Sequence, residues 1–409
     1  MSLLRQDMTI AEIVSSFPET AAVFAAHGLE KFTDGEVLRV LGPFLTLKTA
    51  LRDRGVNVGL FLQLLEERIQ EFGALQEKTL ANLKEGQGSL SLLALLPCGL
   101  KVPFGKALEN LMTPLQASSP RPIRYIVEGN LNQELSYYPY VNQLETLDEL
   151  PDLILTADIN SFYYKTFRDR FITPGHFVDV TDYPANSCFG DVQIQDPQRN
   201  YTMLTVNPLV IVADKQRCAD RPLPRRWSDI LDPSWKRSIT MRGDGSFFCH
   251  AILLPMYKNL GAEGVQALGK NVFNGWHPAQ MVKEAGNGRE EGAALYLMPH
   301  FFAQKIPHKD KVEIIWPDDG AVVSPVTLLV KKERAEELKP ITDFLTGREL
   351  ATMFAGAYFP AVHPEVDNRV PDGKTFSWLG WDFCRDNDIE AVNDTIDELF
   401  LPNWREGRE

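Results

Sequence analysis

The feature that most constrains the fold is a series of short apolar runs that begins near residue 90 and alternates with helical patterns. The runs are apolar throughout rather than at every second position, which is typical of strands covered on both faces. Strands joined by helices predict an α/β domain with mostly parallel sheets. The strand candidates are Leu90–Leu96, Ile123–Glu128, Leu153–Thr156, Met203–Ala213, Ile239–Met241, Ala293–Met298, Val312–Ile315 and Val322–Val330. The helix candidates between and after them include Lys106–Met112, Phe248–Asn259, Gly264–Asn271, Ala335–Leu345 and Asp388–Leu399.

Two of the extended runs are unusually long. Tyr201–Asp214 is interrupted by Asn207-Pro208, and Asp319–Lys331 also contains a proline. Two long crossings with a polar cleft between them would form a hinge, so they predict a bilobed domain. The alternative is that both are long strands of one large sheet.

The first eighty-odd residues have a different pattern, which predicts a separate helical domain. Thr9 and Glu12 have the spacing of a capping box, and the apolar residues from Leu60 to Phe72 keep helical spacing. The polar stretch Lys84–Ser89 reads as a linker. We therefore expect a small helical domain at 1–86 and an α/β domain at 89–409.

Composition excludes several classes of protein. A chain of 409 residues is too long for one ordinary core. Its net charge of −13 and its lack of a basic run argue against a nucleic-acid partner. Five widely spaced cysteines favour a reducing compartment, and the first ten residues leave no room for a signal peptide. We expect a cytoplasmic protein without membrane insertion, or a periplasmic one if a signal peptide has been removed.

Known catalytic and metal motifs are missing from the sequence. The seven histidines lack zinc-binding spacing, and there is no nucleophile elbow, Walker A loop or dinucleotide fingerprint. No metal site or cofactor is therefore expected. Cys98 precedes a predicted helix and could act as a nucleophile, but no sequence feature supplies its base.

Three segments in the α/β part resemble a known family. They are Trp227–Lys236, with the pattern W-x-D-[IL]-x-D-P-x-W-K, followed by Glu291–Leu295 and Trp316–Ala321. In this order they resemble bacterial extracellular solute-binding proteins of ABC importers, in the ferric-, phosphonate- and polyamine-type branch. The N-terminal part resembles a small helical domain of unknown function found with hybrid-cluster proteins. Relatives of that domain often carry a cysteine pair after the glycine, whereas Gly28 here is followed by Leu29-Glu30-Lys31-Phe32.

The resemblance implies a type II periplasmic-binding fold, with two α/β lobes joined by hinge strands and a separate N-terminal all-α domain. Lobe 1 would comprise about 89–205 plus C-terminal segments, and lobe 2 about 208–320. The lobes would close over one small polar or charged solute. An ABC permease and a protein bound by the helical domain are possible partners.

Loops that follow strands are the candidates for the solute site, because ligands of open α/β sheets bind outside the carboxyl ends of strands. Helix starts at these loops also present unpaired N–H groups. The candidate ligand-binding residues are Cys98, Gly99, Asp158, Asn160, Ser161, Gly245, Ser246, Tyr296, Asp319 and Gly320.

The sequence leaves the charge of the solute open. Aspartates in the candidate loops would repel an anion and attract a polyamine. Bare ferric iron is disfavoured, because Tyr296-Leu297 stands where ferric-binding relatives place adjacent tyrosines. A binding protein, as a cytosolic sensor or carrier or a transporter component, is the first hypothesis. An enzyme using Cys98 or the Asp158/Asp244 pair is the second, and an interaction scaffold built around the helical domain is the third.

Overall fold

The structure is a computed structural model, and it divides the chain into two compact units, residues 1–86 and 87–409. The residues that the structure describes are 4–26, 29, 45–52, 58, 61–62, 64–66, 68–69, 90–118, 123–129, 138–244, 247–289 and 291–406.

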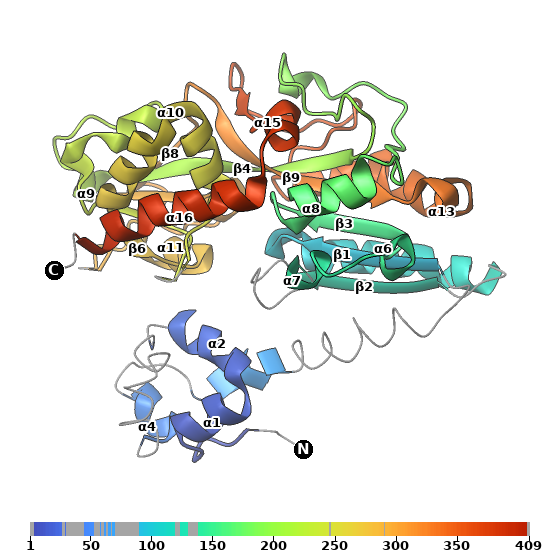
Figure 1. Ribbon diagram of the computed structural model, residues 1–409. Helices are drawn as coiled ribbons and strands as arrows, with labels where there is room; N and C mark the ends of the chain where they lie inside the picture. The colour runs from blue at the N-terminus through green and yellow to red at the C-terminus, as the bar shows by residue number, and fades with distance from the viewer. Residues whose placement is uncertain are drawn as a thin grey trace. The chain divides into compact units, whose positions relative to one another are not determined.

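The N-terminal unit is helical in its described part (Figure 1). Helix α1 (Ile10–Ser16) begins at the predicted capping box, where Glu12 N–H donates to Thr9 Oγ1 and Thr9 N–H donates to the Glu12 carboxylate. It is followed by α2 (Ala21–Ala26) and α4 (Leu47–Arg52). Ile10, Phe24 and Leu47 belong to a single buried cluster. Gly28 and the predicted linker at 84–89 lie outside the described residues.

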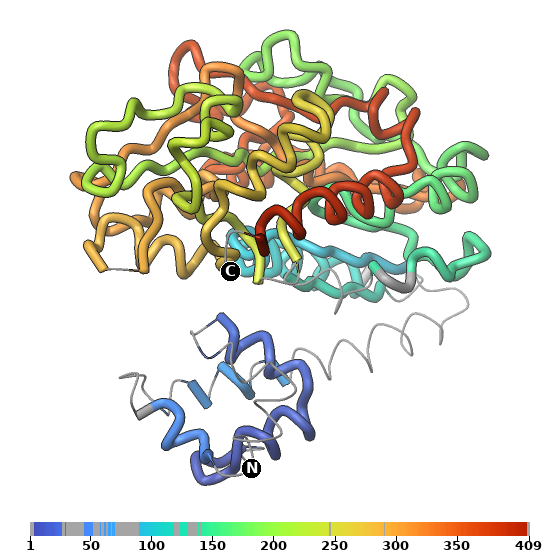
Figure 2. The backbone as a smooth tube through the Cα atoms, turned by 60° about the vertical axis from the view of Figure 1, so that its left-hand side comes forward, coloured from blue at the N-terminus to red at the C-terminus, as the bar shows by residue number. Residues whose placement is uncertain are grey.

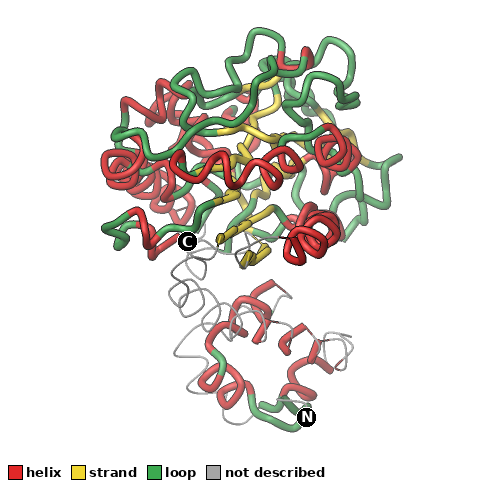
Figure 3. The backbone as a smooth tube through the Cα atoms, turned by 90° about the vertical axis from the view of Figure 1, so that its right-hand side faces the viewer, coloured by secondary structure: helices red, strands yellow, loops and turns green. Residues whose placement is uncertain are grey.

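The second unit is built on a sheet of ten strands (Figure 3). Its main order is β2-β1-β3-β9-β4-β7-β5-β6, while β8 pairs with β4 and β10 pairs with β9. The strands are β1 (Leu90–Leu96), β2 (Ile123–Gly129), β3 (Leu153–Ala157), β4 (Thr202–Asp214), β5 (Ile239–Met241), β6 (Val272–Gly275), β7 (Leu295–Pro299), β8 (Val312–Ile315), β9 (Ala321–Val330) and β10 (Phe376–Ser377).

Strands β4 and β9 are the two predicted crossings, and they connect the two halves of the sheet. They pair antiparallel with each other from Thr202–Leu328 to Leu209–Val322. One end of β9 also pairs with β3, whereas the far end of β4 pairs with β7 and β8. Both strands are buried along their whole length. We call the half containing β1, β2 and β3 lobe 1, and the half containing β5, β6, β7 and β8 lobe 2.

Helices cover the two lobes (Figures 1 and 2). In lobe 1, α6 (Cys98–Ser118), α13 (Ala335–Leu345) and α14 (Arg348–Gly356) bury their apolar residues in one cluster with β1, β3 and β9. In lobe 2, α10 (His250–Asn271), which is kinked at Gly261, packs along α16 (Ile389–Glu406). The remaining helices are α7 (Tyr138–Val141), α8 (Lys165–Phe167), α9 (Lys215–Cys218), α11 (Pro278–Glu284), α12 (His300–Ala303) and α15 (Trp381–Asp386).

The sequence prediction was wrong in three details. The sheet is mixed rather than mostly parallel: five pairings between described strands are parallel, but the crossing strands β9 and β4 pair antiparallel with β3 and β7 respectively. Helix α6 begins at Cys98, eight residues before the predicted helix Lys106–Met112, and it contains Pro103 and Pro114 in its interior. The short strands β6 and β10 and the helix α14 were not anticipated.

Candidate functional site

Three strand ends meet where the two lobes face each other. Cys98 begins α6 after β1, Asp158 follows β3, and Arg242 follows β5. Asp158 and Arg242 belong to different lobes, and Asp158 Oδ2 lies 4.0 Å from Arg242 Nη1. Burial acts to lower the pKa of Arg242, but the neighbouring Cys249, Asp158 and Cys98 raise it overall. Residues from both lobes therefore surround one guanidinium group.

The backbone at Asp158 is constrained. Its φ of 66° lies in the left-handed region, which is uncommon for a residue other than glycine and is often found at functional sites. Its N–H donates to Pro325 O at 2.9 Å, and the Ser324 hydroxyl donates to its Oδ1. Both partners belong to β9. The crossing strand thus fixes the carboxylate of Asp158 beside Arg242.

Asn160 and Ser161 hold the shape of the loop that follows Asp158. The Asn160 amide donates to Thr156 Oγ1 at 2.7 Å and accepts from Phe162 N–H at 3.0 Å. The Ser161 hydroxyl donates to Tyr138 O at 2.9 Å. Both side chains are buried. These hydrogen bonds stabilise the conformation of the loop itself. A ligand contact for either residue stays a prediction.

The turn from Arg242 to Cys249 joins β5 to α10. Gly243 and Phe248 form an isolated bridge across it, and Cys249 N–H donates to Arg242 O at 3.0 Å. The Arg242 side chain is 25% exposed and lies 5.9 Å from the ring centre of Phe247. The predicted site residues Gly245 and Ser246 fall in this turn but lie outside the described residues.

The thiols of Cys98 and Cys249 differ in environment. Cys98 is exposed at the first position of α6, whereas Cys249 is buried at the N-cap of α10. Burial raises the pKa of the Cys249 thiol, against a lowering effect of Arg242. Next to Cys98, a Cβ added to Gly99 would lie 2.9 Å from the Phe301 ring, so the position requires a residue without a side chain. Gly99 thus allows α12 to approach α6 closely.

Three predicted site residues form their contacts away from Cys98, Asp158 and Arg242. The Tyr296 hydroxyl is buried in lobe 2 and accepts from Ala293 N–H at 2.9 Å. The Asp319 carboxylate accepts from Trp227 N–H at 3.2 Å, and Gly320 O accepts from Trp227 Nε1 at 2.9 Å. Asp319 and Gly320 thereby anchor the tryptophan turn that was identified in the sequence.

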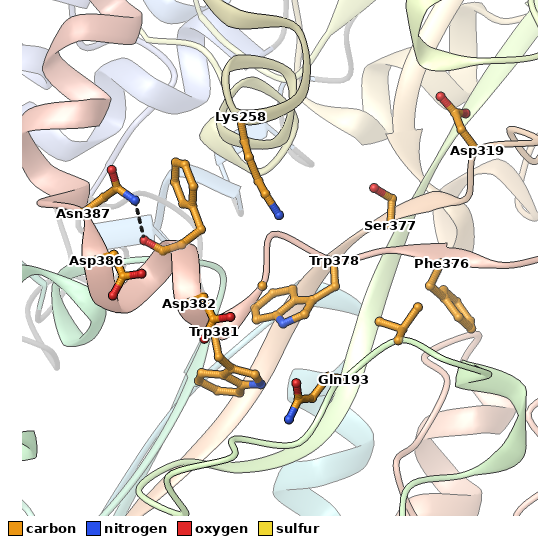
Figure 4. Close-up of a pocket in the computed structure, with 13 residues that line it drawn as sticks. Gln193, Lys258, Asp319, Phe376, Ser377, Trp378, Trp381, Asp382, Asp386 and Asn387 are labelled. Carbon is orange, nitrogen blue, oxygen red and sulfur yellow. Dashed lines mark hydrogen bonds between the residues drawn. The ribbon is translucent and has the colours of Figure 1, made fainter.

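Asp319 also lines a separate cavity of about 630 Å³ (Figure 4). The cavity lies between α10, α15 and the starts of β9 and β10, with Lys258, Trp378 and Trp381 in its wall. Lys258 Nζ donates to Leu379 O at 2.7 Å, and Trp381 Nε1 donates to Ile194 O at 3.0 Å. None of Cys98, Asp158 and Arg242 is among its lining residues.

The described residues contain no obvious binding site for a metal ion. In the described parts of the chain, no group of three or more His, Cys, Asp or Glu side chains is placed to hold one. The described helices also include none with the length and apolar character needed to span a bilayer.

The model of a bacterial extracellular solute-binding protein family matches residues 148–387. The chain belongs to this family. The family assignment agrees with the resemblance seen in the sequence and with binding, rather than catalysis, as the family's role. A second model, a domain of unknown function, matches residues 4–62 of the N-terminal unit.

Solved structures place this solute-binding protein in a bilobed fold. Apo ferric ion-binding protein A of Pasteurella haemolytica aligns with a TM-score of 0.54 at 15% identity, over 77% of this chain and 98% of that one. A Trichodesmium protein in complex with iron and citrate aligns with a TM-score of 0.54 at 11% identity, over 77% and 99%. At such identities the likeness shows the fold alone. No curated protein sequence matches the chain significantly.

The sequence interpretation missed Arg242, Cys249 and Ser324. Arg242 stands directly between the predicted strand Ile239–Met241 and the glycine-containing turn that was predicted to bind ligand. A positively charged residue directly after a buried strand was therefore the sequence signal that could have identified Arg242 as a site residue. Ser324 had no comparable signal, because it lies inside an apolar run and only its contact with Asp158 reveals it.

Proposed function

We propose that this solute-binding protein captures its solute between lobe 1 and lobe 2, at the cluster formed by Cys98, Asp158, Arg242 and Cys249. We call this set the interlobe cluster. The observation that carries the proposal is the approach of Asp158 to Arg242, because the two residues come from opposite lobes.

The two lobes are joined by long strands that allow a hinge motion. A solute that binds Arg242 of lobe 2 while Asp158 of lobe 1 holds that side chain in place would bind the closed arrangement better than an open one. Such differential binding is what shifts a conformational equilibrium. Transport through an ABC permease is the role that fits an extracellular solute-binding family, and it favours the periplasmic location over the cytoplasmic one expected from the sequence.

Hydrogen–deuterium exchange of the full chain tests the proposal. The chain is compared as purified, with any co-purified solute identified by native mass spectrometry, and after extensive dialysis. We expect the bound form to be protected at 158–161 and at 242–249 together, while the exposed start of α14 is unchanged. Protection confined to one lobe, or none in the presence of a bound solute, would refute capture between the lobes.

A further inference from the structure

The side chain of Arg242 has more hydrogen-bond donors than the protein uses. A guanidinium group carries five N–H donors. The thiol of Cys249 lies beside this group, and the nearest carboxylate oxygen, on Asp158, is 4.0 Å from Arg242 Nη1, beyond hydrogen-bond distance. In the described chain no carbonyl, carboxylate or hydroxyl oxygen accepts a hydrogen bond from this group.

Other arginines of this domain show what a structural role looks like. Arg168 donates to Asn387 O at 2.8 Å, and Arg237 donates to Val272 O at 2.7 Å and to Trp404 O at 3.0 Å. Those guanidinium groups tie segments together through carbonyl oxygens. Arg242 has no such partners, and its side chain is one-quarter exposed, so its remaining donors are open to an acceptor from outside the chain.

The hydrogen-bond donors of Arg242 favour an anion over a cation. A cationic solute would approach Arg242 directly and be repelled by it, since arginine stays charged at all relevant pH values. The carboxylate of Asp158 already accepts from the Ser324 hydroxyl and faces Arg242 with its other oxygen. Burial raises the pKa of the nearby Cys249 thiol. The carboxylate of Asp158 offsets part of the positive charge, so the preference for an anion rests on the N–H donors of Arg242, which only an acceptor can fill.

The ends of two long helices add to this preference. Cys98 and Cys249, which lie near Arg242, are the first residue of α6 and the N-cap of α10. The N-terminus of a helix carries a partial positive charge. The arginine and the two helix ends thus act on the same region in the same direction.

We propose that the solute carries a carboxylate or oxyanion group that Arg242 binds with two parallel hydrogen bonds. This rests on the proposed function, because it names the class of solute for the same interlobe cluster. Asp158 acts as a positioning residue that holds the guanidinium from the opposite lobe.

Isothermal titration calorimetry of the dialysed full chain tests the class of solute. The anionic probes are phosphate, sulfate, succinate and citrate, which separate oxyanions from carboxylates, while putrescine and glucose represent cationic and neutral solutes. We expect saturable binding of at least one anion and none of putrescine or glucose. Arg242→Gln should weaken that binding at least about 30-fold, and Arg242→Lys about tenfold, since lysine keeps the charge without the fork.

The matched control is Arg348→Gln, which removes an exposed arginine paired with exposed Glu365 and should change affinity less than about twofold. If putrescine or glucose binds with an affinity that Arg242→Gln leaves unchanged, the anion assignment is wrong but capture between the lobes stands. If none of the six probes binds and none changes exchange at 158–161 or 242–249, both proposals fail.

Discussion

The loop after β3 and the turn after β5 occupy similar places in the two lobes but use their polar groups differently. In the loop after β3, the side chains of Asn160 and Ser161 form hydrogen bonds within the protein. Their partners are Thr156, Phe162 and Tyr138. In the second, Arg242 leaves most of its donors unused. A polar loop at the end of a strand is therefore not by itself a binding site, and the destination of each hydrogen bond separates a scaffold from a site.

The largest effect should come from the scaffold loop. Asn160→Ala removes several buried hydrogen bonds and leaves their partners unsatisfied, so it should lower the free energy of unfolding by about 3 kcal/mol. Urea unfolding followed by circular dichroism measures this. A loss below about 1 kcal/mol would show that the loop is held by other means and would remove the contrast with Arg242.

A second substitution tests the close packing beside Cys98. Gly99→Ala places a Cβ against the Phe301 ring and should cost about 2 kcal/mol of unfolding free energy. Gly105→Ala, in the same helix with nothing within 4 Å, is the matched control and should stabilise by about 0.5–1 kcal/mol. Equal effects of the two substitutions in thermal or urea unfolding would contradict the close approach of α6 and α12.

His300, at the end of β7, provides a pH-dependent contrast with the permanently charged Arg242. Burial, with a smaller effect of Lys309, lowers the pKa of His300 to about 4, below its ordinary value of 6.5. The unfolded chain therefore binds the extra proton first, and stability should fall by about 1–2 kcal/mol between pH 6.5 and 4. His300→Gln should reduce this fall in urea unfolding measured across that range. An unchanged pH dependence in the variant would show that other groups cause it.

The smallest effect should come from the proposed site itself. Arg242→Gln should change the free energy of unfolding by less than about 1 kcal/mol, because the side chain makes few bonds within the protein and its burial is costly. Unfolding without added solute measures this, alongside Asn160→Ala. A loss as large as that of Asn160→Ala would indicate that Arg242 supports the fold rather than a ligand.

Local patterns predicted the elements of the fold well. The crossing strands β4 and β9 were recognisable because long apolar runs are unusual in the chain, and α13 was predicted with its observed bounds. The runs around Tyr296 and Asp319 were also placed correctly, yet their side chains turned to Ala293 and Trp227. Strand propensity fixes where a loop begins, but it carries no information on which way the next side chains point.

By itself the sequence determined the helical and α/β parts, the two crossings and the family resemblance, because periodicity and short motifs are local properties of the chain. Only the tertiary structure decided that Asp158 of lobe 1 faces Arg242 of lobe 2. It also decided that the Asn160 side chain forms its hydrogen bonds within its own loop, whereas Arg242 keeps N–H donors that no oxygen of the described chain accepts from. Those outcomes depend on contacts between residues far apart in the sequence, and hydrogen bonds are assigned only when such residues meet.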